Sequence, residues 1–118
     1  MSVFTFDATM KNVVSHLRSG LALDSQELAD VLGVTPRTVD RWQGNQAVPQ
    51  RATRDRITRL LALERELRDT FDSETAIRSW LNTDNHYLGG IKPIEALRVG
   101  RYDRVEAALE ALASGVFV

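Results

Sequence analysis

The chain has 118 residues, a formal net charge of -1 at pH 7 and no cysteine. The length suffices for one ordinary hydrophobic core, or for two small helical parts that share one, and the composition excludes disulfides, thiolate metal ligands and cysteine nucleophiles. The N-terminal residues lack the segments of a signal peptide, and no apolar run approaches the roughly 20 residues of a membrane span. We therefore expect a soluble, cytoplasmic protein with no membrane partner.

Basic residues are concentrated in the first half of the chain. Residues 1–68 carry ten Lys/Arg and eight Asp/Glu, whereas residues 69–118 carry five and eight. Within residues 37–59 there are six arginines and two aspartates, a local net charge of +4. Such a cluster is typical of nucleic-acid-binding surfaces, but solvated helix faces also carry scattered arginines, so charge alone leaves both interpretations open.

Glycines, prolines and capping residues divide the sequence into short amphipathic segments, and no segment alternates as a half-buried strand does. The patterns predict an all-α protein. A first helix is predicted over residues 7–18, ended by Gly20. The second helix should begin after Asp24, because Asp24 and Glu27 have the spacing of a capping box. The apolar face of the first helix comprises Met10, Val13, Val14 and Leu17.

A tight turn should join the second helix to a third. Gly33 can adopt the left-handed conformation that ends a helix, and Thr35 and Pro36 supply a hydroxyl cap and a first-turn proline for the next one. Val39 and Trp42 are three residues apart and should both face the core. The polar residues between and after them then lie on the outer face.

A longer helix is predicted over residues 51–71, followed by shorter helices in "ETAIRSWLN", "IEALRV" and "YDRVEAALEALAS". Ser73 can cap the first of these, while Gly100 and Gly115 should end the last two. Residues 1–70 and 71–118 are expected to form two parts that pack together, because no Pro/Ser-rich linker separates them. The apolar stripe predicted for the long helix comprises Ile57, Leu60, Leu61, Leu67 and Phe71.

Two helices across a glycine turn, the second with outward arginines, form the pattern of a helix-turn-helix, whose second helix enters the DNA major groove. Position by position, "SQELADVLGVTPRTVDRWQGN" resembles the Xre-type helix-turn-helix of phage-repressor-like regulators. The resemblance places Pro36, Arg37 and Arg41 at base-facing positions, and arginine reads guanine well. Asp40 between them would repel phosphate. The residues predicted around these two arginines should contact phosphates. The predicted DNA-binding residues are Thr35, Arg37, Thr38, Arg41, Gln43, Arg51 and Arg54.

The second half carries a further resemblance. "AIRSWLNTDNHYLGGIKPIEALRVGRYDRVEAALEALASG" is similar to the C-terminal toxin-binding domain of the Xre/MbcA/ParS antitoxins. The two segments occur in the family's order and together cover most of the chain. The residues that carry this likeness are Trp80, Leu81, Asn85, Leu88, Gly89, Gly90, Pro93, Leu97, Gly100, Val105, Leu109 and Gly115.

The resemblance implies an antitoxin that neutralises a RES-domain toxin, which degrades NAD, and that represses its own operon by binding operator DNA. In this family the C-terminal part contacts the toxin and can block its NAD site. The apolar end "VFV" would enter that site, or Phe117 would instead fold back on the last helix. A homodimer or a larger toxin–antitoxin complex is expected, because one helix-turn-helix covers few base pairs. The predicted toxin-binding residues are Asn85, Tyr87, Leu88, Gly89, Gly90, Lys92, Gly115, Val116, Phe117 and Val118.

Other residues predict no catalytic, metal or cofactor site. His16 and His86 lack metal-ligand spacing, and no nucleophile, base and orienting group can be assembled from the sequence. Both tryptophans are expected in the core. The acidic series Glu64, Glu66, Asp69 and Asp72 is expected to form i, i+4 pairs with Arg65 and Arg68 along the helix. The competing interpretation of the whole chain is a plain helix-turn-helix repressor whose second half serves dimerisation.

Overall fold

The computed structural model describes residues 6–44 and 46–115, and in these residues it contains α-helices, one 3-10 turn and no strand, which confirms the all-α prediction. None of the described helices is long and apolar enough to cross a membrane. The elements are α1 (Phe6–Leu21), α2 (Ser25–Leu32), α3 (Pro36–Gln43), α4 (Arg51–Thr70), α5 (Glu74–Leu81), η1 (His86–Leu88), α6 (Pro93–Arg98) and α7 (Tyr102–Ala113).

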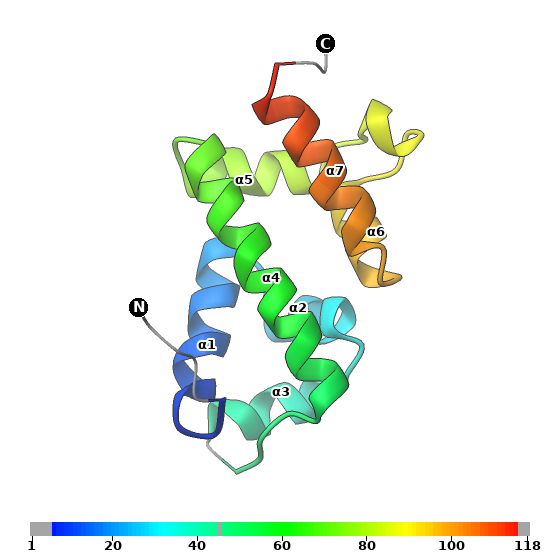
Figure 1. The fold of residues 1–118 in the computed structure, drawn as a ribbon. Helices are drawn as coiled ribbons and strands as arrows, with labels where there is room; N and C mark the ends of the chain where they lie inside the picture. Colours follow the sequence, from blue (N-terminus) through cyan, green and yellow to red (C-terminus); the bar gives the residue numbers. More distant parts are fainter. Residues whose placement is uncertain (1–5, 45, 116–118) are drawn as a thin grey trace.

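Helix α4 is the longest helix and contacts both halves of the molecule (Figure 1). The helices α1 and α2 of the first half and α5 and α7 of the second half all pack against it. Direct contacts between α2 and α6 and between α1 and α5 also join the halves. A single cluster of buried hydrophobic residues runs from Met10 to Leu109, so the halves share one core.

The predicted signals at both ends of α2 and at the start of α3 are confirmed. The Asp24 carboxylate accepts from the Glu27 N–H at 2.8 Å, and the Glu27 carboxylate accepts from the Asp24 N–H at 3.0 Å. Gly33 adopts φ +72° at the end of α2, where residues with a Cβ are strained. Thr35 then caps α3, accepting the Thr38 N–H at 3.2 Å, and Pro36 occupies the first turn.

The prediction that Gly20 ends the first helix is wrong. Helix α1 continues to Leu21, and Ala22 is the residue with positive φ, at +56°. Gly20 serves a different purpose, because a Cβ atom there would lie 2.6 Å from Oε2 of Glu64. The missing side chain therefore allows α1 to approach α4 closely.

The predicted apolar stripe of the long helix differs from the buried face at four residues. Leu61 and Phe71 are half-buried, whereas Leu63 and Glu64 are buried. The buried positions Leu60, Leu63 and Leu67 follow the three- and four-residue spacing of one helix face, and Leu61 lies at its edge. Burial of Glu64 could not be expected, because a carboxylate needs partners from elsewhere to enter a core.

Those partners come from two helices. Oε1 of Glu64, a residue only 1% exposed, lies 2.9 Å from Nε2 of His16, on α1. The Arg68 guanidinium donates to the same carboxylate, from Nε at 2.7 Å and from Nη2 at 3.2 Å. The predicted pairing of Glu64 with Arg68 is confirmed. His16, which looked isolated in the sequence, contacts Glu64 across the α1–α4 interface.

Both tryptophans contribute to packing, but unequally. Trp42 is 2% exposed and lies in the core, as predicted. Trp80 is half-buried at the core's margin, where its ring lies 6.0 Å from that of Phe71.

Candidate functional site

The outer face of α3 carries the residues predicted to read DNA. Val39 and Trp42 are 0% and 2% exposed and hold α3 against the core. Arg37 and Arg41 therefore lie on the opposite, exposed face, one helical turn apart. Asp40 is exposed on the same helix, as the sequence implied. The geometry is that of a helix-turn-helix, with a three-residue turn between Leu32 and Pro36.

The polar residues around this helix are less uniform. The hydroxyl of Thr35 lies 3.0 Å from that of Thr38, and both groups contribute to starting α3. Thr38 and Gln43 are half-buried. Arg51 and Arg54 are exposed in the first turns of α4, at the same end of the molecule as α3 (Figure 1). The structure thus brings the whole predicted DNA-binding set to one end of the molecule.

A second exposed feature is the loop that contains η1, which we call the 85–92 loop. The backbone of Asn85 organises it: its N–H donates to the Ile91 carbonyl at 2.9 Å, and its carbonyl accepts the N–H groups of Leu88 and Gly90 at 3.0 and 2.9 Å. Gly89 and Gly90 have φ of +76° and +96°, values that L-residues with side chains rarely adopt. Both glycines are exposed, and a Cβ at either would meet no atom within 4 Å.

The side chains of the 85–92 loop divide into inner and outer groups. Asn85 and Leu88 are 7% and 5% exposed, so these two predicted toxin-binding residues support the loop from inside. Tyr87 and Ile91 are 43% and 45% exposed, and Lys92 is also exposed. The sequence patterns did not single out Ile91. Its signal was an apolar residue directly after two glycines, where a loop rather than a helix face would present it.

The predicted site at the C-terminus is described only in part. Gly115 is exposed beyond the end of α7, with φ +76°. The predicted residues Val116, Phe117 and Val118 lie outside the described residues.

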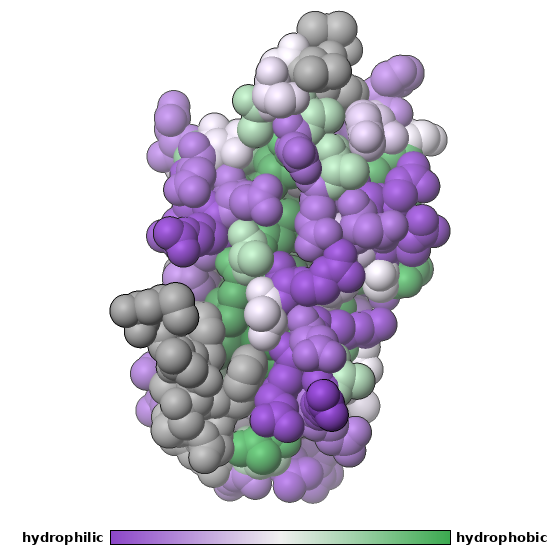
Figure 2. Space-filling model, in the orientation of Figure 1, coloured by the Kyte–Doolittle hydropathy of each residue, from purple (hydrophilic) through white to green (hydrophobic). Residues whose placement is uncertain are grey.

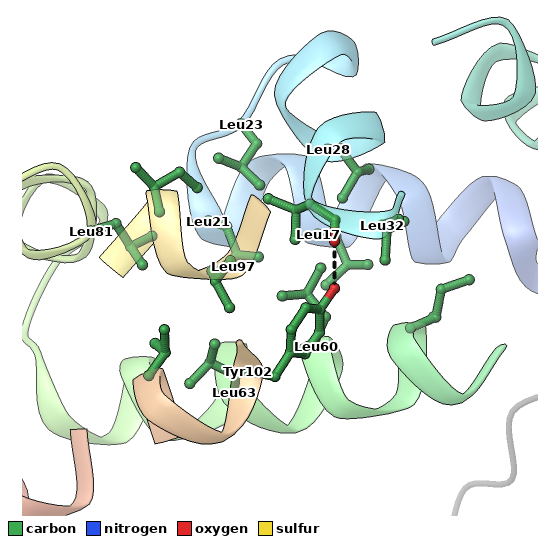
Figure 3. Close-up of a cluster of buried hydrophobic side chains, with 14 of the residues drawn as sticks. Leu17, Leu21, Leu23, Leu28, Leu32, Leu60, Leu63, Leu81, Leu97 and Tyr102 are labelled. Atoms are coloured by element: carbon green, nitrogen blue, oxygen red, sulfur yellow. Dashed lines mark hydrogen bonds between the residues drawn. The ribbon is translucent and has the colours of Figure 1, made fainter. Parts of the chain in front are cut away.

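One buried hydrogen bond joins the two halves of the molecule through the core. The Tyr102 hydroxyl on α7 donates to the carbonyl of Val31 at 2.7 Å, in the last turn of α2 (Figure 3). The last carbonyls of a helix have no partner within it, so the tyrosine satisfies a group that burial would otherwise leave unpaired. Burial raises the pKa of Tyr102 to about 12, although Arg56 and Arg59 oppose this shift. The hydroxyl therefore remains a donor at neutral pH.

Together these features define a class: an all-α protein with a helix-turn-helix in its first half and a small helical domain, bearing a projecting loop, in its second. Residues 66–115 match the family model of the antitoxin Xre/MbcA/ParS C-terminal toxin-binding domain. The chain is 35% identical over 111 residues to the mycobacterial cidal antitoxin MbcA of Mycobacterium tuberculosis, covering 91% of this chain and 97% of MbcA. The chain therefore belongs to the Xre/MbcA/ParS family of antitoxins.

Two further comparisons agree. A probable mycobacterial cidal antitoxin of the same species is 30% identical over 92 residues, covering 78% of this chain and 77% of that protein. The fold is similar to a chain in the crystal structure of the M. tuberculosis MbcT–MbcA toxin–antitoxin complex, with a TM-score of 0.74 and 33% identity. That match covers 92% of this chain and 97% of the other. The resemblance to the Xre/MbcA/ParS antitoxins is confirmed over both halves of the molecule.

Proposed function

We propose that this protein neutralises a toxin by binding it through its second half, from about residue 71 onward, and that the toxin is a RES-domain enzyme that degrades NAD. The observation that carries the proposal is the 85–92 loop, which projects Tyr87 and Ile91 from within the segment matched by the toxin-binding family model. Aromatic and apolar side chains on a braced loop are the residue types that anchor protein interfaces. The similarity to an antitoxin crystallised with its toxin supports the same assignment.

Neutralisation follows from stoichiometric occlusion of the toxin's NAD site. The loop supplies a rigid contact, since the Asn85 backbone bonds hold its shape before binding and reduce the entropy lost on association. We expect residues 115–118 to enter the NAD site. In this role the chain binds and blocks, and performs no chemistry itself.

A paired substitution tests the loop. The variant Tyr87→Ala with Ile91→Ala should lower affinity for a co-expressed RES-domain protein from the same organism by roughly 10- to 100-fold, the usual range for two interface anchors. Binding is measured by calorimetry, and neutralisation by growth and cellular NAD. The matched control is Val48→Ala, because Val48 is also exposed, at 55%, but belongs to the loop between α3 and α4. Equal toxin affinity for wild type and the loop variant would exclude this surface.

Deletion of residues 115–118 addresses the end of the chain separately. The shortened protein should keep its fold and lose neutralisation. If cells tolerate the toxin equally well with it, the C-terminal residues do not occlude the NAD site.

We also propose that the protein represses its own operon through α3 as a homodimer or within the toxin complex. Arg37 and Arg41 are exposed one turn apart on the helix that such motifs insert into the major groove. The variant Arg37→Ala with Arg41→Ala should abolish preference for the DNA upstream of its gene while neutralisation persists. Loss of neutralisation in this variant, with DNA binding unchanged, would place the arginines in the toxin interface instead.

A further inference from the structure

We propose that the turn between α6 and α7 extends the DNA-binding surface, with Arg98, Arg104 and Arg56 contacting backbone phosphates beside the helix-turn-helix. This inference rests on the proposed binding of operator DNA. It concerns mainly the second half of the chain, which matches the family model of a toxin-binding domain. Three properties of the turn support it: its charge, its position and the pairing of the ionic groups around it.

The charge distribution singles out residues 98–104. The second half, residues 69–118, carries five basic and eight acidic residues. Three of the five basic residues, Arg98, Arg101 and Arg104, fall within seven positions that contain one acid, Asp103. The rest of the second half has two basic and seven acidic residues. The α6–α7 turn is therefore a basic segment in an otherwise acidic half.

Contacts with the first half hold this segment against the helix-turn-helix. Tyr102, within the segment, donates its hydroxyl to Val31 at the end of α2. The Arg56 guanidinium lies between two glycine turns: a Cβ built on Gly33 would collide with its Nη1, and one built on Gly100 would lie 3.1 Å from its Nη2. The turn before α3 and the turn before α7 thus flank one arginine of α4. In Figure 1 the α6–α7 turn lies on the same side of the molecule as the α2–α3 turn.

The pairing of charges leaves several arginines available. Arg59 on α4 is bound by Glu106 of α7, with Nη2 2.6 Å from Oε1, so its charge is largely compensated. Arg101 has a looser partner in Asp103, at 3.6 Å. Arg98 and Arg104 are exposed, and the described part of the chain provides no ion pair for either. Figure 2 shows hydrophilic residues over much of this side of the molecule, with a strip of hydrophobic residues along its middle.

DNA phosphate is the ligand that this surface fits. Exposed arginines on a turn beside a recognition helix can bind the backbone that flanks the groove, which positions the protein without reading bases. Each phosphate contact releases bound counterions and makes the affinity more dependent on salt. The α6–α7 arginines should therefore alter the salt dependence of binding and leave sequence preference unchanged.

The test compares the full-length wild type with Arg98→Ala/Arg104→Ala. Fluorescence anisotropy measures affinity for a duplex carrying the sequence upstream of the gene, and for a shuffled duplex, between about 50 and 200 mM salt. The plot of log affinity against log salt should become shallower by about one for each phosphate that the variant no longer binds. The ratio of affinities for the two duplexes should not change. The matched control is Arg65→Ala/Arg78→Ala, which removes two exposed arginines elsewhere on α4 and α5.

Each result decides the proposal. A shallower slope in Arg98→Ala/Arg104→Ala alone supports it. If both double variants match wild type, or both lower the slope equally, the α6–α7 turn makes no specific phosphate contact and the proposal is wrong, although operator binding through α3 stands. A wild type that binds neither duplex overturns both proposals. If Arg98→Ala/Arg104→Ala lowers affinity for the toxin and leaves the slope unchanged, the basic turn belongs to the toxin interface and the proposal is wrong.

Discussion

Helix α4 is joined to its two neighbours by polar contacts of different kinds. Toward α1, the Glu64 carboxylate is 1% exposed and lies between His16 and Arg68. Toward α7, the ion pair of Arg59 and Glu106 lies at the surface, its side chains 49% and 34% exposed. The buried tyrosine contact to Val31 accompanies the surface pair. Charged groups thus join α4 to one neighbour in the buried core and to the other at the surface.

The difference teaches that burial, more than the count of ion pairs, decides what a charge contributes. An exposed pair exchanges water for a partner at nearly equal free energy, whereas a buried carboxylate must be fully satisfied. The α1–α4 junction should therefore tolerate substitution poorly and the Arg59–Glu106 pair should tolerate it well. Four substitutions test this contrast, beginning with the largest effect.

The buried junction should fail first. Glu64→Ala removes an acceptor shared by His16 and Arg68 and should lower the free energy of unfolding by about 2–4 kcal/mol, because hydrogen bonds to charged groups contribute most. Urea denaturation measures the change. Glu66→Ala, at an exposed position of the same helix, is the matched control and should change stability little. Equal losses in the two variants would contradict the contrast.

Removing one hydroxyl tests the buried contact on the α7 side. Tyr102→Phe leaves the Val31 carbonyl unpaired and should cost about 1–3 kcal/mol at pH 7 to 9. In wild type the folded pKa is about 12 and the ordinary value is 10.0, so the unfolded state loses the proton first as pH rises. Wild-type stability should therefore fall between these values by up to about 1.4 kcal/mol per pH unit. The gap to Tyr102→Phe should narrow over that range; a constant gap would contradict the assignment.

A local helix cap gives the next smaller effect. Thr35→Ala removes the acceptor for the Thr38 N–H and should cost about 1 kcal/mol. The control is Thr58→Ala, because the Thr58 hydroxyl donates to the Arg54 carbonyl within α4 and caps no helix end. Alanine should be tolerated there or slightly favourable, since its helix propensity is higher. Thermal denaturation compares the two, and an equal loss would argue against a capping role for Thr35.

The surface pair should matter least. Arg59→Ala should lower stability by less than about 1 kcal/mol, even though it also removes a cation positioned 5.7 Å from the centre of the Tyr102 ring. High salt should shrink this difference, because exposed charges are screened. The loss in Glu64→Ala should change less under the same conditions. A salt-independent loss above about 2 kcal/mol for Arg59→Ala would remove the distinction between the two junctions.

Local sequence signals predicted much of the fold and a good part of the site. The Asp24 capping box, Gly33 and the Thr35–Pro36 start each act within a few residues, so their effect could be inferred without knowing the rest of the molecule. The outward position of Arg37 and Arg41 followed from the inward pair Val39 and Trp42 through helical periodicity. The roles of these arginines and of the 85–92 loop remain predictions.

Other features depended on residues far apart in sequence. Gly20 looked like a helix end because glycine often is one, but the position of Glu64, 44 residues later, gave it a packing role. His16 looked solitary because its partner, Glu64, lies far along the chain. Leu88 is among the predicted toxin-binding residues, and the structure places its side chain in the core.

By itself the sequence determined the helices, most of their ends and the helix-turn-helix, because caps, turns and periodicity act over one or two turns of chain. The resemblance to the antitoxin family also came from the sequence alone. The tertiary structure alone decided which charges are buried, that Tyr102 reaches Val31, and that the basic α6–α7 turn lies beside the helix-turn-helix. These features arise from desolvation and close packing between helices, and both depend on distances that no local pattern encodes.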